Sequence, residues 1–350
     1  MRCKNMGVGQ ISSAVKSCPG MQAARHGAGM ETRSGTHTRL CTLLSRDAWF
    51  FLPIRPSCLT RKGMDTARKT VFLLFFLVLL PVLCHAMQET EPTAPGEEIR
   101  WTSPEAGMDT ALLAYKVQVG DDYRRHVFIR ALRFDTARYD FALFSSRWEG
   151  QPVRTMREWA DSTDIAAATN ACMYQKDGVT ATGYMRSGSR TNNARVVKNF
   201  GSFFVSGPRL EGLPRAAVLD RNSDDWEELL PLYDTVVQNF RLMGPEGQQI
   251  WPEKGPRHAV AAVAEDKTGR ILFLHCSDPV SVHEFVDALN AHKRLLLKSA
   301  MYVEGGSDAT VMLKSGSQTF LWNGMSPASI MLSSRGDDIP LPNILGALRR

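Results

Sequence analysis

Short stretches in which apolar and polar residues partly alternate dominate the chain after residue 100. Such stretches, when rich in β-branched and aromatic residues, are typical of strands. They predict strands over residues 126–133, 139–145, 165–171, 202–205, 216–219, 235–238, 259–264, 271–276 and 295–303. Apolar residues at helical spacing are rarer and predict helices over residues 155–160 and 278–292, the second starting at Asp278 and Pro279. Many strands and few helices predict a single α+β domain with a large mixed or mostly antiparallel sheet.

The longest apolar run, residues 71–83, lies before this region and has the flanks of a secretory signal peptide. Arg68 and Lys69 precede it, and Ala86 provides a small residue for cleavage. The run is shorter than the roughly 20 residues that a membrane-spanning helix needs. We therefore predict a signal peptide over residues 64–86 and a periplasmic or secreted protein. The alternatives are a retained anchor and a lipoprotein modified at Cys84.

The segments on either side of residues 64–86 lack the periodicity of a folded domain. A signal peptide stands at an N-terminus, so we expect translation to start at Met64 and residues 1–63 not to belong to the native protein. The alternative is a disordered basic extension. Residues 87–100, which are polar and rich in proline, are expected to form a flexible linker. The domain itself is expected over residues 101–350.

The positive net charge of +6 belongs to the leader and not to the domain. Residues 1–86 contain 12 of the 42 Lys and Arg but 3 of the 36 Asp and Glu, so the remainder has 30 basic and 33 acidic residues, a net charge of −3. We therefore expect no nucleic-acid partner, and membrane contact only through the signal segment. Only Cys172 and Cys276 follow residue 86. Two cysteines are not a disulfide framework, so we favour free thiols, with one disulfide as the alternative.

One motif, YVEGGSDAT at residues 302–310, ends the last predicted strand with a carboxylate and two glycines. Gly305 and Gly306 allow backbone angles, or a close approach of ligand, that other residues do not. Glu304 is a candidate general acid or base. The alternative is a hairpin turn with a solvated glutamate.

Three further stretches carry polar residues at or near strand ends. Asn170 ends an apolar strand, where its amide can bind a sugar hydroxyl or close the turn through backbone bonds. Gln238 and Arg241 interrupt apolar positions, and arginine is suited to phosphate, although most arginines are exposed or ion-paired. Arg257 and His258 precede a strand, where the histidine is a catalyst or a structural hydrogen-bonding residue. No spacing typical of a metal site or a cofactor motif accompanies them.

Taken in this order, the four stretches resemble the phosphodiester glycosidase family over roughly residues 128–313. The family has an Asn-Gly/Ala-Gly-aromatic stretch at a strand end, which Asn170 to Tyr174 resemble. It has a glutamine opening a strand, an arginine leading a later one, and an acidic-Gly-Gly-Ser motif, which Gln238, Arg257 and residues 304–307 resemble. Departures are Cys172 for the usual glycine, His258 for a small hydroxyl residue, and Glu304 for the more usual aspartate. They indicate a divergent bacterial branch.

The resemblance implies a hydrolase that cleaves a sugar-1-phosphate phosphodiester in envelope or extracellular glycans, without cofactor or metal. In that reading the acid/base residue is Glu304, with Asp308 as a lesser candidate. The expected substrate-binding residues are Arg241 and Arg257 for the phosphate, Asn170, Gln238 and Ser307 for the sugar hydroxyls, and Gly305 and Gly306 as space for either group. The alternatives are a non-catalytic glycan-binding envelope protein on the same fold and a structural envelope protein that tolerates Gly305→Val.

Overall fold

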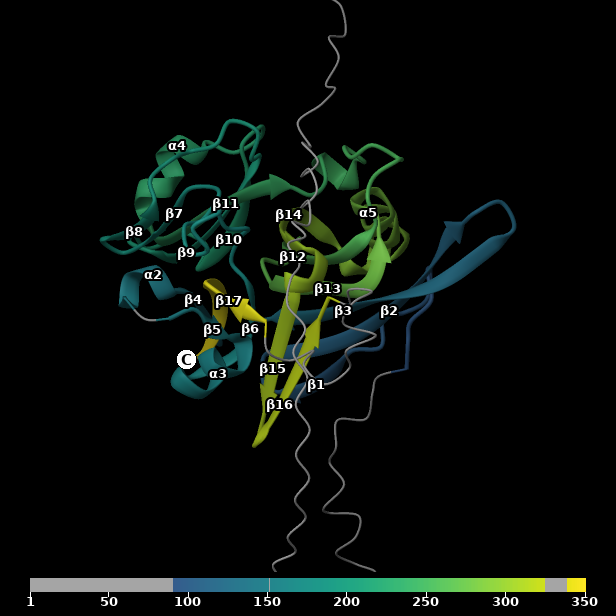
Figure 1. Cartoon of the computed structure of the whole chain (residues 1–350), viewed down its shortest axis with the longest axis horizontal. Helices are drawn as coiled ribbons and strands as arrows, with labels where there is room; N and C mark the ends of the chain where they lie inside the picture. Colours follow the sequence, from purple (N-terminus) through teal and green to yellow (C-terminus); the bar gives the residue numbers. More distant parts are fainter. Residues whose placement is uncertain (1–90, 151, 325–338) are drawn as a thin grey trace, which may run out of the picture. The chain divides into compact units, whose positions relative to one another are not determined.

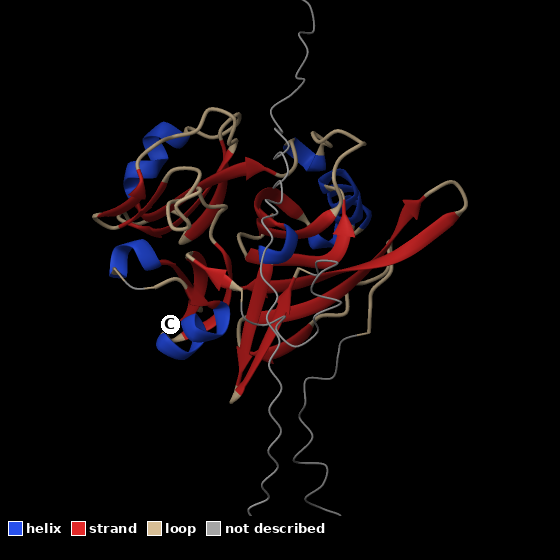
Figure 2. Ribbon diagram, in the orientation of Figure 1, coloured by secondary structure: helices blue, strands red, loops and turns tan. Residues whose placement is uncertain are grey.

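The computed structural model describes residues 91–150, 152–324 and 339–350 (Figure 1). The segments predicted as a non-native leader and a signal peptide, residues 1–63 and 64–86, lie outside the described residues. Strands dominate (Figure 2), and neighbouring strands pair antiparallel, as in β12 with β13 and β14. The α+β class with a large, mostly antiparallel sheet is therefore confirmed. In the described part of the chain, no helix is long and apolar enough to cross a membrane.

The larger sheet has the strand order β1-β2-β3-β13-β12-β14-β11-β7-β8, with β9 paired to β11 and β10 paired to β9. Its centre, β12 and β13, is buried on both faces, as expected of strands rich in alanine, valine and leucine. The strands are β1 (Thr102–Glu105), β2 (Met108–Val119), β3 (Tyr123–Phe134), β7 (Met185–Ser187), β8 (Arg190–Asn193), β9 (Ser202–Pro208), β10 (Ala216–Asp220), β11 (Tyr233–Arg241), β12 (His258–Asp266), β13 (Ile271–Val280) and β14 (Leu297–Gly305).

A second sheet has the order β16-β15-β6-β18-β4, and a short pair joins β17 to β5. Its central strand β6 is Ile165–Asn170, and all six of its residues are buried. Small side chains there let β15 and β18 pack closely on both sides. The other strands are β4 (Tyr139–Ser145), β5 (Arg154–Thr155), β15 (Thr310–Ser315), β16 (Gln318–Asn323), β17 (Pro340–Leu341) and β18 (Asn343–Arg349).

The main core lies between the two sheets. Phe273 and Met301 of the larger sheet share one buried cluster with Ala167, Val311 and Leu345 of the second sheet. Each sheet also buries its other face under a helix. The four helices of the described residues are α2 (Ser146–Glu149), α3 (Met156–Ser162), α4 (Trp226–Leu229) and α5 (Val282–Ala291).

Helix α5 covers the larger sheet and α3 covers the second sheet. Phe285 and Leu289 of α5 pack with Val260 of β12, and Trp159 of α3 packs with Met312 of β15. Both contacts follow the helical spacing of the apolar residues. Four single turns of 3₁₀ helix complete the described elements: η1 (Leu230–Leu232), η2 (Pro245–Gly247), η3 (Lys293–Leu295) and η4 (Gly306–Asp308).

The prediction that the second helix starts at Asp278 and Pro279 is wrong, because both residues still belong to β13. The helix begins at Val282 after the N-cap Ser281. The Ser281 hydroxyl accepts from the Glu284 amide at 3.1 Å, and the Glu284 carboxylate accepts from the Ser281 amide at 2.8 Å. This capping box satisfies two N-terminal amides of the helix, which Asp278 would satisfy only by breaking the strand.

The expectation of a flexible linker up to residue 100 does not hold from Thr93 onward. Thr93 is fully buried, and its backbone bonds to β2 from both sides, donating to Leu112 O and accepting from Ala114 N at 2.8 Å each. Ile99 is buried in the cluster beneath α5. A polar, proline-rich composition does not reveal this, since one threonine and one isoleucine provide the attachment.

Candidate functional site

A β-bulge in β14 turns Glu304 toward the space between the sheets. Tyr302 pairs with Ala262 and faces α5, so strict alternation would turn Glu304 to the same face. The register shifts between these pairs, and Glu304 pairs instead with Ala261, which faces the second sheet. Bulges commonly redirect side chains next to active sites. The bulge therefore moves a carboxylate from beneath the helix to the junction of the two sheets.

The segment after Glu304 crosses from one sheet to the other. Gly306 has φ +75°, a left-handed conformation that favours glycine, and a Cβ there would meet nothing within 4 Å. Gly305 differs, because its Cβ would collide with the Tyr302 hydroxyl and lie 2.8 Å from the His258 ring. Thus Gly306 borders open space, whereas position 305 requires glycine because the Tyr302 and His258 side chains occupy the space that a Cβ would need.

The Glu304 carboxyl is buried, with 8% of the residue exposed. Burial raises its pKa to about 8, and the negative charge of Asp308 adds to this increase. The Gly305 amide, which donates to Glu304 Oε1 at 3.0 Å, acts in the opposite direction. The carboxyl is therefore mostly protonated at neutral pH and can donate a proton.

Asp308 lies four residues beyond Glu304, with both carboxylate oxygens bonded. The Tyr174 hydroxyl donates to Oδ2 at 2.6 Å, and the Ser307 hydroxyl donates to Oδ1 at 3.0 Å. Burial raises the pKa of Tyr174, and its hydrogen bond to Asp308 adds to this effect. Tyr174, the aromatic residue of the stretch that resembles the family, fixes the second carboxylate.

Asn170 closes the crossing segment, as in the turn-closing alternative. Its Nδ2 donates to the Asp308 carbonyl at 2.8 Å, and its Oδ1 accepts from the Thr310 amide at 2.7 Å. The residue is 2% exposed. Asn170 thus binds backbone on both sides of Ala309 and holds the segment that carries Asp308 against the end of β6.

His275 also binds this segment, although no local pattern in the sequence indicates a role for it. Burial lowers its pKa to about 4, so the ring is neutral. Nε2 lies 3.0 Å from the Ala309 carbonyl and must donate to it, which leaves Nδ1 to accept from the Ser277 hydroxyl at 3.4 Å. The strand registers place His275 beside Ala261, and Ala261 beside Glu304. Only the sheet pairing, which is not readable from the sequence, reveals this neighbour.

Gln238 was expected to bind a sugar hydroxyl, and the structure contradicts this. The side chain is fully buried, and its amide already has four backbone partners. Oε1 accepts from the amides of Tyr184 at 3.3 Å and Val197 at 2.8 Å, while Nε2 donates to the carbonyls of Val197 at 2.8 Å and Phe200 at 2.9 Å. An amide has four hydrogen-bonding positions, so none remains for a ligand.

Arg241 and Arg257 were expected to hold the phosphate, and both guanidinium groups are paired with carboxylates of the protein. The guanidinium of Arg241 pairs with Asp220 at 3.1 Å, which is the ion-paired alternative. The exposed guanidinium of Arg257 donates to Glu284 at 3.0 Å and to the Gln118 carbonyl at 2.6 Å. Each cation is thus neutralised by a carboxylate of the protein.

Neither a metal cluster nor a disulfide is found in the described part of the chain. Over residues 91–150, 152–324 and 339–350, no group of three His, Cys, Asp or Glu could hold a metal ion. Cys172 and Cys276 are buried free thiols. The groups that the structure brings together are the carboxyls of Glu304 and Asp308, the hydroxyls of Ser307 and Tyr174, and the amide of Asn170, and they offer proton transfer and hydrogen bonding.

Among solved structures the chain is similar to the auto-inhibited catalytic domain of zebrafish N-acetylglucosamine-1-phosphodiester alpha-N-acetylglucosaminidase, with 13% identity, a TM-score of 0.49, and 72% of this chain and 88% of that chain covered. It is also similar to a hypothetical protein from Synechocystis, with 12% identity, a TM-score of 0.47, and coverage of 73% and 64%. No curated protein matches it. A family model described as phosphodiester glycosidase matches residues 163–346, more than half of the 350 residues, and so the chain belongs to the phosphodiester glycosidase family.

Proposed function

We propose that the protein hydrolyses a sugar-1-phosphate phosphodiester and that Glu304 transfers the proton. The observation that carries this proposal is the buried Glu304 carboxyl, with a pKa of about 8, beside a second carboxylate held by Tyr174 and Ser307. Two carboxyl groups in contrasting environments are the usual arrangement for hydrolysis at a glycosidic centre.

In this mechanism the bond between the sugar C1 and the phosphate oxygen breaks. Glu304 gives its proton to that oxygen, and the phosphate monoester leaves. A water molecule adds to C1 and passes its proton to Asp308. The open space at Gly306 and the hydroxyl of Ser307 lie between the two carboxyls along the chain, so they are the groups to contact the sugar or the phosphate. Asn170 and His275 act indirectly, by fixing the backbone that carries Asp308.

The test is release of free sugar from a panel of methyl sugar-1-phosphate diesters. Glu304→Gln removes the proton and is expected to lower turnover by a factor of about 100 or more. Glu304→Asp, which shortens the side chain by one methylene, is expected to keep partial activity. Glu253→Gln is the matched control, because Glu253 is exposed on the loop before β12. Equal turnover of the wild type and Glu304→Gln would exclude the assigned role.

A non-catalytic glycan-binding protein is the second candidate, and one observation favours it. Arg241 and Arg257, the cations expected to hold the phosphate, are paired with Asp220 and Glu284. Titration calorimetry with the same diesters separates the candidates. Binding without turnover in the wild type supports the binding protein, whereas turnover that is lost in Glu304→Gln while binding remains supports the enzyme.

The substrate's location is part of the proposal. We propose export through the signal peptide at residues 64–86, since an envelope or extracellular glycan requires the domain to leave the cytoplasm. N-terminal sequencing of protein recovered outside the cytoplasm is expected to begin at Met87. Recovery of chains that begin before residue 64 in the cytoplasm alone would contradict this.

A further inference from the structure

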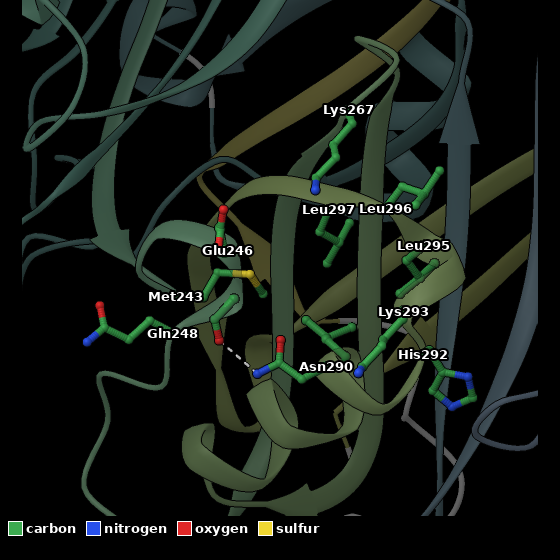
Figure 3. A pocket seen from close by; sticks show the side chains of 12 residues that line it. Met243, Glu246, Gln248, Lys267, Asn290, His292, Lys293, Leu295, Leu296 and Leu297 are labelled. Carbon is green, nitrogen blue, oxygen red and sulfur yellow. Dashed lines mark hydrogen bonds between the residues drawn. The ribbon is translucent and has the colours of Figure 1, made fainter.

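A cavity of about 510 Å³ lies at the end of α5 (Figure 3), and the proposed hydrolysis does not use it. Its walls come from η2, from the turn between β12 and β13, from the end of α5, and from η3 with the first residue of β14. Leu297 stands at the opposite end of β14 from Glu304, which corresponds to roughly 20 Å at the usual strand rise. The cavity is therefore a separate site.

Lys267 and Lys293 line this cavity, and the backbone of Leu296 forms a hydrogen bond with the backbone of each. Leu296 O accepts from the Lys267 amide at 2.8 Å, and the Leu296 amide donates to Lys293 O at 3.1 Å. The lysines lie in the β12–β13 turn and in η3, so this link joins two segments that are distant in the sequence. In the view of Figure 3 the Lys267 side chain ends near Leu297, and the Lys293 side chain ends near Asn290. In the described part of the chain, Glu246 is the one carboxylate among the lining residues, which leaves an excess of positive charge.

The most accessible apolar residue of the lining is Leu296, and Met243, Leu289 and Leu295 lie behind it, almost fully buried. Aliphatic side chains form most of this surface, and among the described lining residues there is no Phe, Tyr or Trp and the one ring is the buried imidazole of His292. A surface of this kind suits an aliphatic chain better than a glycan.

Leu296 has an unusual conformation for its residue type. Its φ is +52°, in the left-handed region that glycine and asparagine prefer, and the residue is 51% exposed. Its backbone conformation is therefore unfavourable, and burial of the side chain does not compensate for it. Glu246 on the opposite wall has φ +54°, and these two are the positive-φ residues other than glycine in the described chain. Unfavourable backbone conformations of this kind concentrate at ligand sites.

We infer that this cavity binds a small amphipathic anion, with its phosphate or carboxylate group between Lys267 and Lys293 and its aliphatic chain on Leu296 and the leucines behind it. The Asn290 side chain supports the wall facing the lysines, because its Nδ2 donates to the Gly247 carbonyl at 2.8 Å (dashed in Figure 3). The ligand class combines both features of the lining, since a free phosphate would use only the lysines and a neutral detergent only the leucines.

Isothermal titration of the full chain with three probes tests this inference. Octyl phosphate is expected to bind at one site. Inorganic phosphate lacks the alkyl chain and octyl glucoside lacks the charge. Each is expected to bind at least about ten-fold more weakly than octyl phosphate. Absence of octyl phosphate binding up to about 1 mM, or equal affinity for octyl glucoside, overturns the proposal.

Variants test whether octyl phosphate binds in this cavity or elsewhere on the surface. The double change Lys267→Met with Lys293→Met is expected to weaken octyl phosphate binding by about ten-fold or more, whereas Lys116→Met, an exposed lysine on β2, leaves it unchanged. Leu296→Gly is expected to weaken binding while it raises the melting temperature, because it removes the ligand contact and the unfavourable φ together. Unchanged affinity in either variant, with circular dichroism equal to that of the wild type, overturns the assignment.

Discussion

Replacing Glu304 with glutamine is expected to stabilise the protein while it removes the proposed activity. The pKa of this carboxyl rises from an ordinary value of 4.5 to about 8 in the folded protein. Between these two values the folded state binds more protons than the unfolded state, so stability falls as the pH rises. Holding the carboxyl in the folded protein costs about 3 kcal/mol at pH 7 and about 5 kcal/mol above pH 9, but nothing below pH 4. Glutamine does not ionise and avoids this cost.

Urea denaturation of the wild type and Glu304→Gln at pH 4, 7 and 9 measures the effect. The difference in the free energy of unfolding is expected to be near zero at pH 4 and to grow with pH. Glutamine keeps an oxygen that can accept from the Gly305 amide, so the hydrogen bond at 3.0 Å does not confound the comparison. Glu253→Gln, on the exposed loop, is expected to show no such trend. A difference of the same size at pH 4 and pH 9, or destabilisation at pH 9, would refute the reasoning.

Four further outcomes follow from the described contacts. Wild-type turnover is expected to decline as the pH rises through about 8, the pKa at which Glu304 loses its proton, and a rate profile that is flat from pH 6 to 9 contradicts this. Tyr174→Phe removes a hydrogen bond to Asp308, so kcat is expected to fall about ten-fold while the free energy of unfolding falls by about 1 kcal/mol. An unchanged kcat refutes the role assigned to Tyr174. Gln238→Leu removes the acceptor of the Tyr184 and Val197 amides, whereas the Val197 and Phe200 carbonyls keep their bonds from Arg221. We expect it to lower the free energy of unfolding by about 3 kcal/mol, and an unchanged denaturation midpoint argues against this. Arg257→Ala is expected to change the free energy of unfolding by less than about 1 kcal/mol and to leave turnover intact. A large loss of turnover would show that Arg257 contributes to the active site.

The sequence predicted strands where apolar and small residues cluster, but it predicted none over β2, β15, β16 or β18. The strand predicted over residues 139–145 coincides with β4, and the small-residue stretch at residues 165–171 is β6 to within one residue. The start of α5 was misplaced because Asp278 and Pro279 form a good local signal for a helix start. Long-range pairing of Val280 with His258 keeps them in β13 instead. The Ser281–Glu284 capping box stands in the sequence and would have indicated the correct boundary, but the Asp-Pro pair was preferred.

The candidate site was predictable only in part, because residue type does not reveal the hydrogen-bonding partner. Asn170 does contact the segment that follows Glu304, since its amide bonds to the backbone of Asp308 and Thr310. Gln238 and Arg257 are polar too, but Gln238 bonds to backbone groups and Arg257 pairs with the carboxylate of Glu284. His275 acts through Ala309, which is 34 residues away, and no local pattern indicates that contact.

The geometry of the site also depends on how far apart the core holds the two sheets. Glu304 belongs to the larger sheet, whereas Asn170 belongs to the second sheet, and the segment between them spans the interval that the buried cluster fills. The thickness of that cluster therefore acts as a spacer that sets how far the carboxylates stand from the amide. Adding two methyl groups to a fully buried small residue of β6, as in Ala167→Val, would push the sheets apart from within. Such a change would alter proton transfer without touching any residue that a substrate meets.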